Sequence, residues 1–511
     1  MSPGSPVRRG VIAAVGTAAS LSLVLAGCSS GSSSDEDATS FVIGVTSDPD
    51  TLFPWKATQF QAVNVLQNIY GTLTEYDQDL EVVPGLAESW DTSDDGTTVT
   101  FHLRDGVKFA DGSDFDSEDV KYSLDAIKDE KTAAVAAASL ASVEEVEATD
   151  PTTVTLRLSA PDAALPSNLA VVNMAMLSSD DTEEELNTTP NGTGPFSFDT
   201  RTANQSLTLK RNDNYWGDPA KLDAIEFRVI PDEDSIVSAM QSGNVHMAVI
   251  DNSLVAQTAE DSGLAVAKTP QLSYHTLQLN THNGDMDDVN VRLAIQCAVD
   301  RQEVLDTAAF GEGEVTGPIT SPAYKSDPNA RPCPTRDLDK AADYLAKAGK
   351  DSVTVKTIVS QGEYATSVDE AQNLKSQLAE ANIDLDLEVL ESGAYVDAWV
   401  AGEFDAAVAL NGGRQDPDGM YGRYFTSDGN LNPVAGYSSP ELDKLFAEGR
   451  ATDDVAQRKE IYQQVGQELE DNAAWIWLFT SYTYTVTADG VDGFVPTATG
   501  SLQYLRTTTL S

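Results

Sequence analysis

The sequence predicts an α/β protein made of more than one domain, on three observations. The chain has 511 residues, too many for one ordinary hydrophobic core, so two or three domains are expected. Residues 225–250 show a strand, a helix and a strand at the spacing of a βαβ unit. Residues 353–410 show three alternating strands separated by two helices, which predicts a parallel sheet with right-handed crossovers.

The elements of the first half follow from period-2 alternation and from capping residues. Val99, Phe101 and Leu103 alternate with polar residues, as in a strand with one buried face. Asp116 or Ser117 can cap a helix whose apolar residues recur at i, i+4 and i+7. By the same criteria we expect strands at 42–45, 107–109, 154–158 and 207–209, and a helix over 63–70 that ends at Gly71.

The second half of the chain has the clearest pattern. Gly402 and Ser439-Pro440 mark the end of one helix and the start of another. We expect strands at 353–359, 385–389, 404–410 and 475–479, and helices at 368–378, 395–399 and 455–469.

The composition is that of a globular protein with a strongly acidic surface. Hydrophobic residues make up 41% of the chain, and the mean hydropathy is -0.26. The 32 basic and 81 acidic residues leave a net charge of -49, which argues against binding nucleic acid or anionic lipid head groups. A solvated surface explains this charge, and a specific affinity for cations is the alternative.

The sequence of the amino end is typical of a secretion signal. Arg8 and Arg9 precede an apolar run over 11–25, which is typical of a secretory signal and short for a membrane span. The run ends in Leu-Ala-Gly-Cys, which resembles the bacterial lipobox, so we expect a signal over 1–28 and acyl chains on Cys28. Residues 29–40 then form a flexible tether. A freely secreted protein is the alternative, and the two arginines leave Sec and twin-arginine export both open.

Cys297 and Cys333 are the remaining cysteines. In an oxidising compartment such a pair predicts a disulfide, with two buried free thiols as the alternative. Metal ligation is not expected, because no histidine or third cysteine is close to them in sequence.

The chain carries none of the common catalytic motifs. It has no G-x-S-x-G elbow, no H-E-x-x-H, and no phosphate loop, since Gly349-Lys350 is followed by Asp351. Its four histidines lack the paired spacing of a zinc site. We therefore expect a binding protein that is not an enzyme and that holds no cofactor or metal.

Four stretches resemble a known family. They are residues 86–127, 192–196, 210–216 and 292–301, and they run in the family's order over nearly the whole chain after the tether. The string at 86–127, LAESWDTSDDGTTVTFHLRDGVKFADGSDFDSEDVKYSLDAI, closely resembles the signature of the family 5 extracellular solute-binding proteins of ABC importers, the peptide- and nickel-binding group.

This resemblance implies a periplasmic-binding-protein fold: two α/β lobes around a ligand cleft, with an extra inserted domain. Two chain crossings, near Lys268 and Val486, would act as the hinge between the lobes. The implied parts are lobe I at 41–57, 190–268 and 486–511, the inserted domain at 58–189, and lobe II at 269–485.

The candidate pocket is the loop that follows the strand at 404–410. Ligands of parallel α/β sheets lie beyond the carboxyl ends of strands, and this strand leads directly into a polar, Gly-rich segment. An ordinary surface turn is the alternative. The candidate residues in the loop are Gly413, Arg414, Gln415, Asp416 and Asp418.

The resemblance makes one residue of this loop important. Peptide-binding members carry an aspartate shortly before a proline, and it pairs with the α-amino group of the ligand. That position falls here on Gly413, or on Arg414 in another alignment, and neither is acidic. A buried ammonium without its counter-ion is unfavourable by several kcal/mol, which argues against reading a free amino terminus. Either Asp416 or Asp418 takes over this role, or Arg414 binds a carboxylate or phosphate.

Aromatic residues beside predicted strand ends are further candidates, because such side chains supply apolar area to broad-specificity sites. Each also has an alternative place in the core, and of Trp475 and Trp477 at most one is expected to line the cleft. The candidates are Trp399, Trp475, Tyr274 and Tyr421.

The resemblance implies a monomeric, lipid-anchored receptor on the outer face of the cell membrane. It would capture oligopeptides or dipeptides and deliver them to the permease subunits of an ABC importer. Two alternatives stay open: a non-peptide solute (a metal chelate, a sugar or an acidic metabolite), and a ligand sensor without transport.

Overall fold

The computed structural model describes residues 41–361 and 364–511. The predicted signal, the predicted lipidation site Cys28 and the predicted tether lie outside the described residues. Within the described ranges, no helix is both long enough and apolar enough to cross a membrane.

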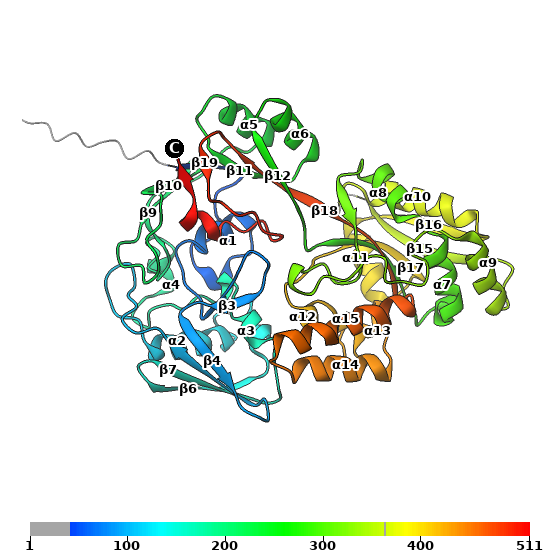
Figure 1. The fold of residues 1–511 in the computed structure, drawn as a ribbon, viewed down its shortest axis with the longest axis horizontal. Coiled ribbons are helices and arrows are strands. Elements are labelled where there is room, and N and C mark those ends of the chain that lie inside the picture. The colour runs from blue at the N-terminus through cyan, green and yellow to red at the C-terminus, as the bar shows by residue number, and fades with distance from the viewer. Residues whose placement is uncertain (1–40, 362–363) are drawn as a thin grey trace, which may run out of the picture. The chain divides into compact units, whose positions relative to one another are not determined.

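Most strands join one large sheet of 12 strands (Figure 1). Along its main path the strand order is β16-β15-β17-β13-β18-β11-β1-β10-β9-β8. The strands are β1 Phe41–Val45, β2 Thr74–Tyr76, β3 Val82–Pro84, β4 Ala87–Thr92, β5 Thr98–Leu103, β6 Val143–Asp150, β7 Thr153–Leu158, β8 Phe196–Thr202, β9 Ser206–Arg211, β10 Ala224–Val229, β11 Met247–Ile250, β12 Ala265–Pro270, β13 Tyr274–Leu279, β14 Gly313–Val315, β15 Val353–Gln361, β16 Ile383–Glu391, β17 Ala406–Asn411, β18 Trp475–Thr487, β19 Val491–Asp492 and β20 Thr509–Leu510.

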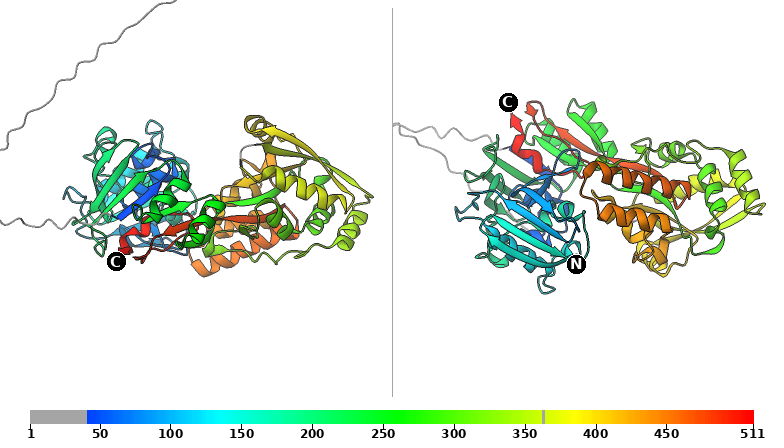
Figure 2. Two further views of the ribbon diagram at one scale, coloured as in Figure 1. Left: turned by 90° about the horizontal axis from the view of Figure 1, so that it is seen from above. Right: turned by 60° about the horizontal axis from the view of Figure 1, so that its bottom comes forward.

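The helices lie between these strands in chain order. In both views of Figure 2, α14 and α15 lie side by side. The ring of Phe446 on α14 is 6.1 Å from that of Tyr462 on α15. The helices are α1 Phe60–Leu66, α2 Ser117–Lys128, α3 Leu165–Asn168, α4 Glu183–Leu186, α5 Glu233–Gln241, α6 Ser253–Asp261, α7 Val289–Ala298, α8 Arg301–Ala308, α9 Leu338–Lys347, α10 Ser367–Ala379, α11 Ser392–Ala401, α12 Pro417–Phe425, α13 Asn432–Ala435, α14 Pro440–Arg450 and α15 Val455–Asp471.

Both predicted parallel units are confirmed. Strands β10 and β11 flank β1 and run parallel to it, with α5 between them in the chain. In the other half, β15 pairs in parallel with both β16 and β17, and α10 and α11 connect them. Gly402 ends α11 with a φ of 68°, a left-handed conformation that glycine adopts without strain.

Two strands carry the chain between the halves of the large sheet. The amino-terminal part of β18 pairs with β13, and its carboxyl-terminal part pairs with β12 on the same side and β11 on the other. Strand β18 is therefore longer than the predicted strand at 475–479. Lys268 is the register partner of Tyr484, and Val266 is that of Val486. The two predicted chain crossings thus form one hydrogen-bonded antiparallel ribbon, which is visible in Figure 1 where β12 meets β18.

Residues between β1 and β8 form a second sheet, β4-β5-β7-β6, which α2 covers. The predicted cap of α2 is confirmed: Asp116 accepts a hydrogen bond from the backbone of Glu118 and forms a capping box with Asp119. The apolar residues of its predicted face, Val120, Leu124 and Ile127, are fully buried.

In this region one predicted helix is present but ends early, and one predicted strand was wrong. The helix at 63–70 ends at Leu66, because the backbone then forms tighter bonds, such as that from Ile69 N to Leu66 O (3.0 Å). Tyr70 is buried, and its hydroxyl donates to Leu52 O (3.3 Å). The predicted strand at 107–109 is only an isolated bridge between Lys108 and Asp114, since two tight turns flank it.

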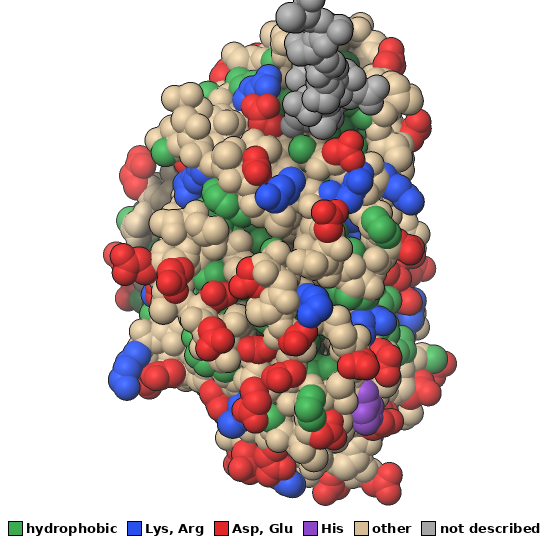
Figure 3. All heavy atoms as spheres, turned by 90° about the vertical axis from the view of Figure 1, so that its left-hand side faces the viewer, with side chains coloured by type: hydrophobic (Ala, Val, Ile, Leu, Met, Phe, Trp, Pro, Cys, Tyr) green, Lys and Arg blue, Asp and Glu red, His purple; other side chains and the backbone are tan. Residues whose placement is uncertain are grey.

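The acidic side chains spread over the surface. In Figure 3 they are scattered across the whole face rather than gathered in one patch. In the part of the molecule that α7 and α9 cover, Cys297 and Cys333 form a disulfide, with their Cα atoms 5.0 Å apart.

Candidate ligand-binding cleft

Three adjoining cavities meet at Gln415. The first has a volume of about 200 Å³, the second about 380 Å³ and the third about 270 Å³. Segments that precede β8 contribute to the lining of all three cavities. The loop before α12 contributes to the opposite wall, which residues 497–506 complete in the first cavity and residues 450–458 in the second. Of the loop residues that the sequence singles out, Gln415 lines all three cavities, Asp416 two and Arg414 one. We call these three cavities the cleft.

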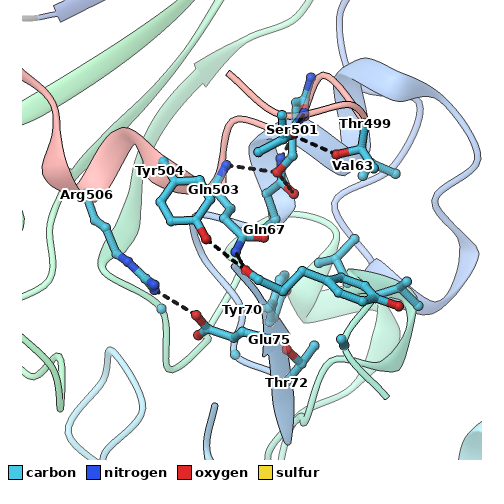
Figure 4. Close-up of a pocket in the computed structure, with 18 of the residues that line it drawn as sticks. Val63, Gln67, Tyr70, Thr72, Glu75, Thr499, Ser501, Gln503, Tyr504 and Arg506 are labelled. Carbon is cyan, nitrogen blue, oxygen red and sulfur yellow. Dashed lines mark hydrogen bonds and ion pairs between the residues drawn. The ribbon is translucent and has the colours of Figure 1, made fainter. Parts of the chain in front are cut away.

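The first cavity is lined by α1, the loop before β2 and the carboxyl-terminal residues 497–506 (Figure 4). Arg506 Nη1 donates to Glu75 Oε2 (3.0 Å) and to the Tyr215 hydroxyl (3.3 Å). The hydroxyl of Tyr504 and the side-chain amide of Gln503 both donate to Tyr76 O. These bonds hold the end of the chain against the wall of the cavity.

The charge of Arg506 is maintained in this setting. Burial acts to lower the pKa of Arg506, but the Glu75 carboxylate and the Tyr215 hydroxyl outweigh it, so this pKa is raised. Burial also raises the pKa of Tyr504 to about 12, so its hydroxyl stays protonated and able to donate. The cavity therefore presents fixed polar groups to a ligand.

Two polar atoms at this cavity have no partner among the described residues. They are the indole nitrogen of Trp216 and the hydroxyl of Thr193, and both are buried. The guanidinium of Arg104 lies 4.4 Å from the centre of the Trp216 ring. Buried polar groups are normally hydrogen-bonded, so these two are available to a ligand. We did not predict either residue, although both lie in the stretches at 192–196 and 210–216 that carry the resemblance.

The second cavity has an acidic lining. Asp416 accepts from Arg458 through both oxygens, at 2.6 and 2.9 Å, and both side chains are about 5% exposed. Arg450 contributes a further positive charge and binds Asp418 at 2.8 Å. The other charged residues of the lining are Glu81, Asp94, Asp95, Asp162 and Asp453.

The carboxylates of the loop are thus already bound. Asp416 caps α12 and is neutralised by Arg458. Asp418 lines none of the three cavities. Burial raises the pKa of Asp418 to about 6, although Arg450 opposes the shift. Neither side chain has an unoccupied charge for the ammonium of a ligand.

At Gly413, the structure leaves no room for an anchoring side chain. A Cβ atom at this position would lie 1.8 Å from Leu272 O, far inside van der Waals contact. The backbone of Leu272 therefore fills the space that the side chain of the family's aspartate would need. Arg414 lines the third cavity, and its side chain makes no hydrogen bond or ion pair with the described residues.

The four aromatic candidates line none of the three cavities. Tyr274, Tyr421 and Trp475 are at most 1% exposed in one apolar core. The indole of Trp475 donates to Ala435 O (2.7 Å), and that of Trp399 donates to the Gln278 side chain (2.7 Å). Alternation along a strand predicts two faces but not which face is covered, and here helices pack over it. The aromatic residues of the cleft are instead Phe60, Tyr70, Tyr76, Trp90, Tyr215, Trp216, Tyr324 and Tyr504.

Metal-ligating side chains do not gather in the described ranges: no three His, Cys, Asp or Glu residues there are placed to hold an ion. The cleft thus offers aromatic area, fixed hydrogen-bonding groups and charged walls, which suit the capture of a small polar molecule.

The family model described as bacterial extracellular solute-binding proteins, family 5, middle, matches residues 81–432. The chain belongs to this family. It is a solute-binding protein of the kind that serves ABC importers outside the cytoplasm, as its resemblance implied.

Individual relatives cover nearly the whole of this solute-binding protein. The glutathione-binding protein GsiB of Escherichia coli O6:K15:H31 (strain 536 / UPEC) is 27% identical over 468 residues, 89% of this chain and 91% of that protein. The structure of HbpA2 from Haemophilus parasuis has a TM-score of 0.83 at 24% identity, covering 92% of this chain and 100% of that one. DppA from Helicobacter pylori, in complex with peptide STSA, has a TM-score of 0.68 at 25% identity, covering 92% and 98%. The two-lobed periplasmic-binding-protein fold is confirmed.

Proposed function

We propose that this solute-binding protein captures dipeptides or oligopeptides outside the cell and delivers them to an ABC permease. The observation that carries the proposal is the cleft: three cavities of a few hundred Å³ that meet at one residue, Gln415. Pockets of this size bury most of a small ligand. A row of adjoining cavities suits an extended chain with side chains of different sizes.

The relatives support the same class of ligand. GsiB is named for glutathione, itself a small peptide, and the structure of DppA from Helicobacter pylori is a complex with the peptide STSA. In the cleft, the unpartnered groups of Trp216 and Thr193 are a donor and a hydroxyl, which match the carbonyl and amide groups of a peptide backbone.

We propose that the protein binds its ligand without making or breaking covalent bonds. The free energy would come from burying the ligand between the lobes, and the β12–β18 ribbon would bend as they close. The proposed lobe boundaries are those stated above, with the inserted domain at 58–189. We further propose a monomer that is held to the outer face of the membrane by acyl chains on Cys28.

A non-peptide solute is the second candidate. It is favoured by Gly413, where the contact with Leu272 removes the space for an amino-terminus anchor. A metal chelate, a sugar or an acidic metabolite would not need that anchor. A sensor without transport would bind the same ligands but would dock a receptor domain instead of a permease.

Thermal unfolding of the purified protein tests the proposal. The ligands are mixed di- to pentapeptides, the same peptides N-acetylated, and a panel of sugars and metal chelates. A ligand at about a hundred times its Kd adds roughly 2.7 kcal/mol of stability, which gives a measurable rise in Tm. We expect both peptide sets to raise Tm, because the amino terminus has no anchor.

The matched variant is Trp216→Phe, which keeps an aromatic ring at this position and removes the unpartnered N–H together with the second ring of the indole. It should unfold at the same temperature without ligand and bind peptides about tenfold more weakly, the effect of one hydrogen bond. If both peptide sets leave Tm unchanged and another member of the panel raises it, the peptide proposal is refuted and the second candidate takes its place.

A further inference from the structure

Two arginines at the cleft have no acidic partner. The chain carries 81 acidic against 32 basic residues, so most arginines find a carboxylate nearby. In the described part of the chain, nine arginines form ion pairs, and three more donate to backbone oxygens. The side chains of Arg414 and Arg423 alone do neither. This absence is unexpected on so acidic a protein.

The two guanidinium groups are neighbours. The Cδ atom of Arg414 lies 3.5 Å from the position of a Cβ on Gly419, and Arg423 follows Gly419 by four residues on α12. Residues four apart share one face of a helix, so both side chains lie on the same face. Burial lowers the pKa of Arg414, and the charge of Arg423 lowers it further. The two like charges repel each other; Arg414 is solvent-exposed, so water screens part of this repulsion, and an anion bound beside them would offset it further.

In the described chain, the Arg423 side chain also lacks a hydrogen-bond acceptor for one buried nitrogen. Its Nε atom is buried and has no acceptor among the described residues. The guanidinium lies 4.9 Å from the centre of the Tyr424 ring, which holds it in place without neutralising its charge. An unpaired guanidinium N–H inside a protein is costly, so an acceptor supplied from outside would be favourable.

The third cavity gives an anion access to Arg414, whereas Arg423 lies beside Arg414 and outside the lining. Arg414 lines it, and on the facing wall the residues are uncharged, among them Ala136, Ser139 and Asn173. Its one carboxylate is that of Asp416, whose two oxygens are both taken by Arg458. The third cavity is therefore the part of the cleft where positive charge is not cancelled, in contrast to the acidic second cavity.

From these observations we infer that Arg414 binds a carboxylate of the ligand, and that the neighbouring charge of Arg423 strengthens this binding. This inference rests on the proposed peptide function and adds the part of the peptide that is recognised. A guanidinium matches the two oxygens of a carboxylate, and its hydrogen bonds to charged groups are the strong ones. The contact of Gly413 with Leu272 removes the amino-terminal anchor, so the acidic end takes over as the anchor of the ligand.

Binding of N-acetylated peptides with free or amidated carboxyl ends tests this assignment. The variants are Arg414→Gln and Arg423→Gln, with Arg157→Gln as the control. Arg157 is on β7, far in sequence from Arg414, and pairs with Glu147. Its replacement by glutamine changes the net charge by the same amount as each test variant does. We expect the protein and the control to bind free acids about ten- to a hundredfold more tightly than amides. Arg414→Gln should lose this preference and Arg423→Gln should lose part of it, while the affinity of both variants for the amides stays the same.

Because the side chain of Arg414 makes no bond within the described residues, Arg414→Gln should fold normally, and its Tm without ligand checks this. Amidated peptides that contain Asp or Glu separate the two sources of carboxylate: tight binding of these assigns the site to a ligand side chain, and weak binding assigns it to the carboxyl terminus. Equal affinity for free and amidated peptides, unchanged in Arg414→Gln, would overturn the inference and leave the peptide function standing. No binding of either set would overturn both.

Discussion

The buried pair of Asp416 and Arg458 should be the most sensitive point of the cleft wall. The two side chains are about 5% exposed and joined by two hydrogen bonds, at 2.6 and 2.9 Å. Asp416→Asn keeps the oxygen that caps α12 but removes the negative charge, since asparagine is also a good helix cap. Burial opposes the charge of Arg458, and the Asp416 carboxylate is the main group that keeps its pKa raised, with smaller contributions from Tyr462 and Tyr324. The variant therefore leaves a buried cation without its counter-ion.

The size of the loss follows from what Arg458 retains. Breaking a buried ion pair by removing one partner destabilises a protein by about 3–5 kcal/mol. Arg458 still donates to the Tyr324 hydroxyl (2.7 Å) and to Gly449 O (3.0 Å), so we expect the lower end of that range, about 3 kcal/mol. The assay is urea unfolding followed by circular dichroism, in which the midpoint should fall.

Two controls separate charge from packing. Glu147→Gln removes a carboxylate from an exposed pair with Arg157, and it should leave the midpoint where it is. The double variant Asp416→Asn with Arg458→Met removes both charges, and it should recover part of the loss. If Asp416→Asn unfolds at the same urea concentration as the natural protein, the buried pair does not stabilise this wall and the reasoning fails.

Three further predictions concern the same loop and the disulfide. In the folded protein the pKa of Asp418 is raised to about 6, so the folded state holds the proton of this carboxyl more tightly than the unfolded chain does. The free energy of unfolding that this proton contributes is therefore present at low pH and is lost as the pH rises from about 4 through 6. Asp418→Asn should therefore gain about 3 kcal/mol relative to the natural protein between pH 3.5 and pH 7.5, by urea unfolding at both pH values; a constant difference would contradict this. Gly413→Ala places a methyl group 1.8 Å from Leu272 O and should lower the free energy of unfolding by about 1–3 kcal/mol. An unchanged melting temperature would mean that the loop yields without strain. Cys297→Ser opens a disulfide with a sequence separation of 36 residues, for which loop entropy suggests a loss of about 4 kcal/mol. That loss should disappear when both proteins are measured with a reductant present, and its persistence would exclude the disulfide as its source.

Local pattern predicted the framework well, and the cleft only in part. Asp116 and the apolar positions after it specify α2 because a cap and one buried face are properties of neighbouring residues. Strand alternation likewise predicted both parallel units. The pattern did not reveal that helices cover both faces of the strand around Trp475, so aromatic residues of the core were expected in the cleft.

The cleft depends on residues far apart in the chain. Arg458 pairs with Asp416 across 42 positions, and Arg506 reaches Glu75 across 431. Neither partner can be read from spacing, because the contact exists only once the lobes are built. Gln415 and Arg414 could be predicted, since they follow the carboxyl end of a strand, a position that topology alone makes accessible.

The continuous pairing of β18 limits how the protein can open. The ribbon is bonded at its middle as well, where Gln271 N donates to Ser481 O (2.9 Å) and the Thr480 hydroxyl donates to Gln271 O (2.7 Å). A loose linker would let the halves drift apart in any direction, whereas a paired ribbon resists stretching and permits only bending and twisting. The path of opening and closing is therefore narrow. A permease that recognises the closed protein would meet one well-defined surface, set by the stiffness of two strands.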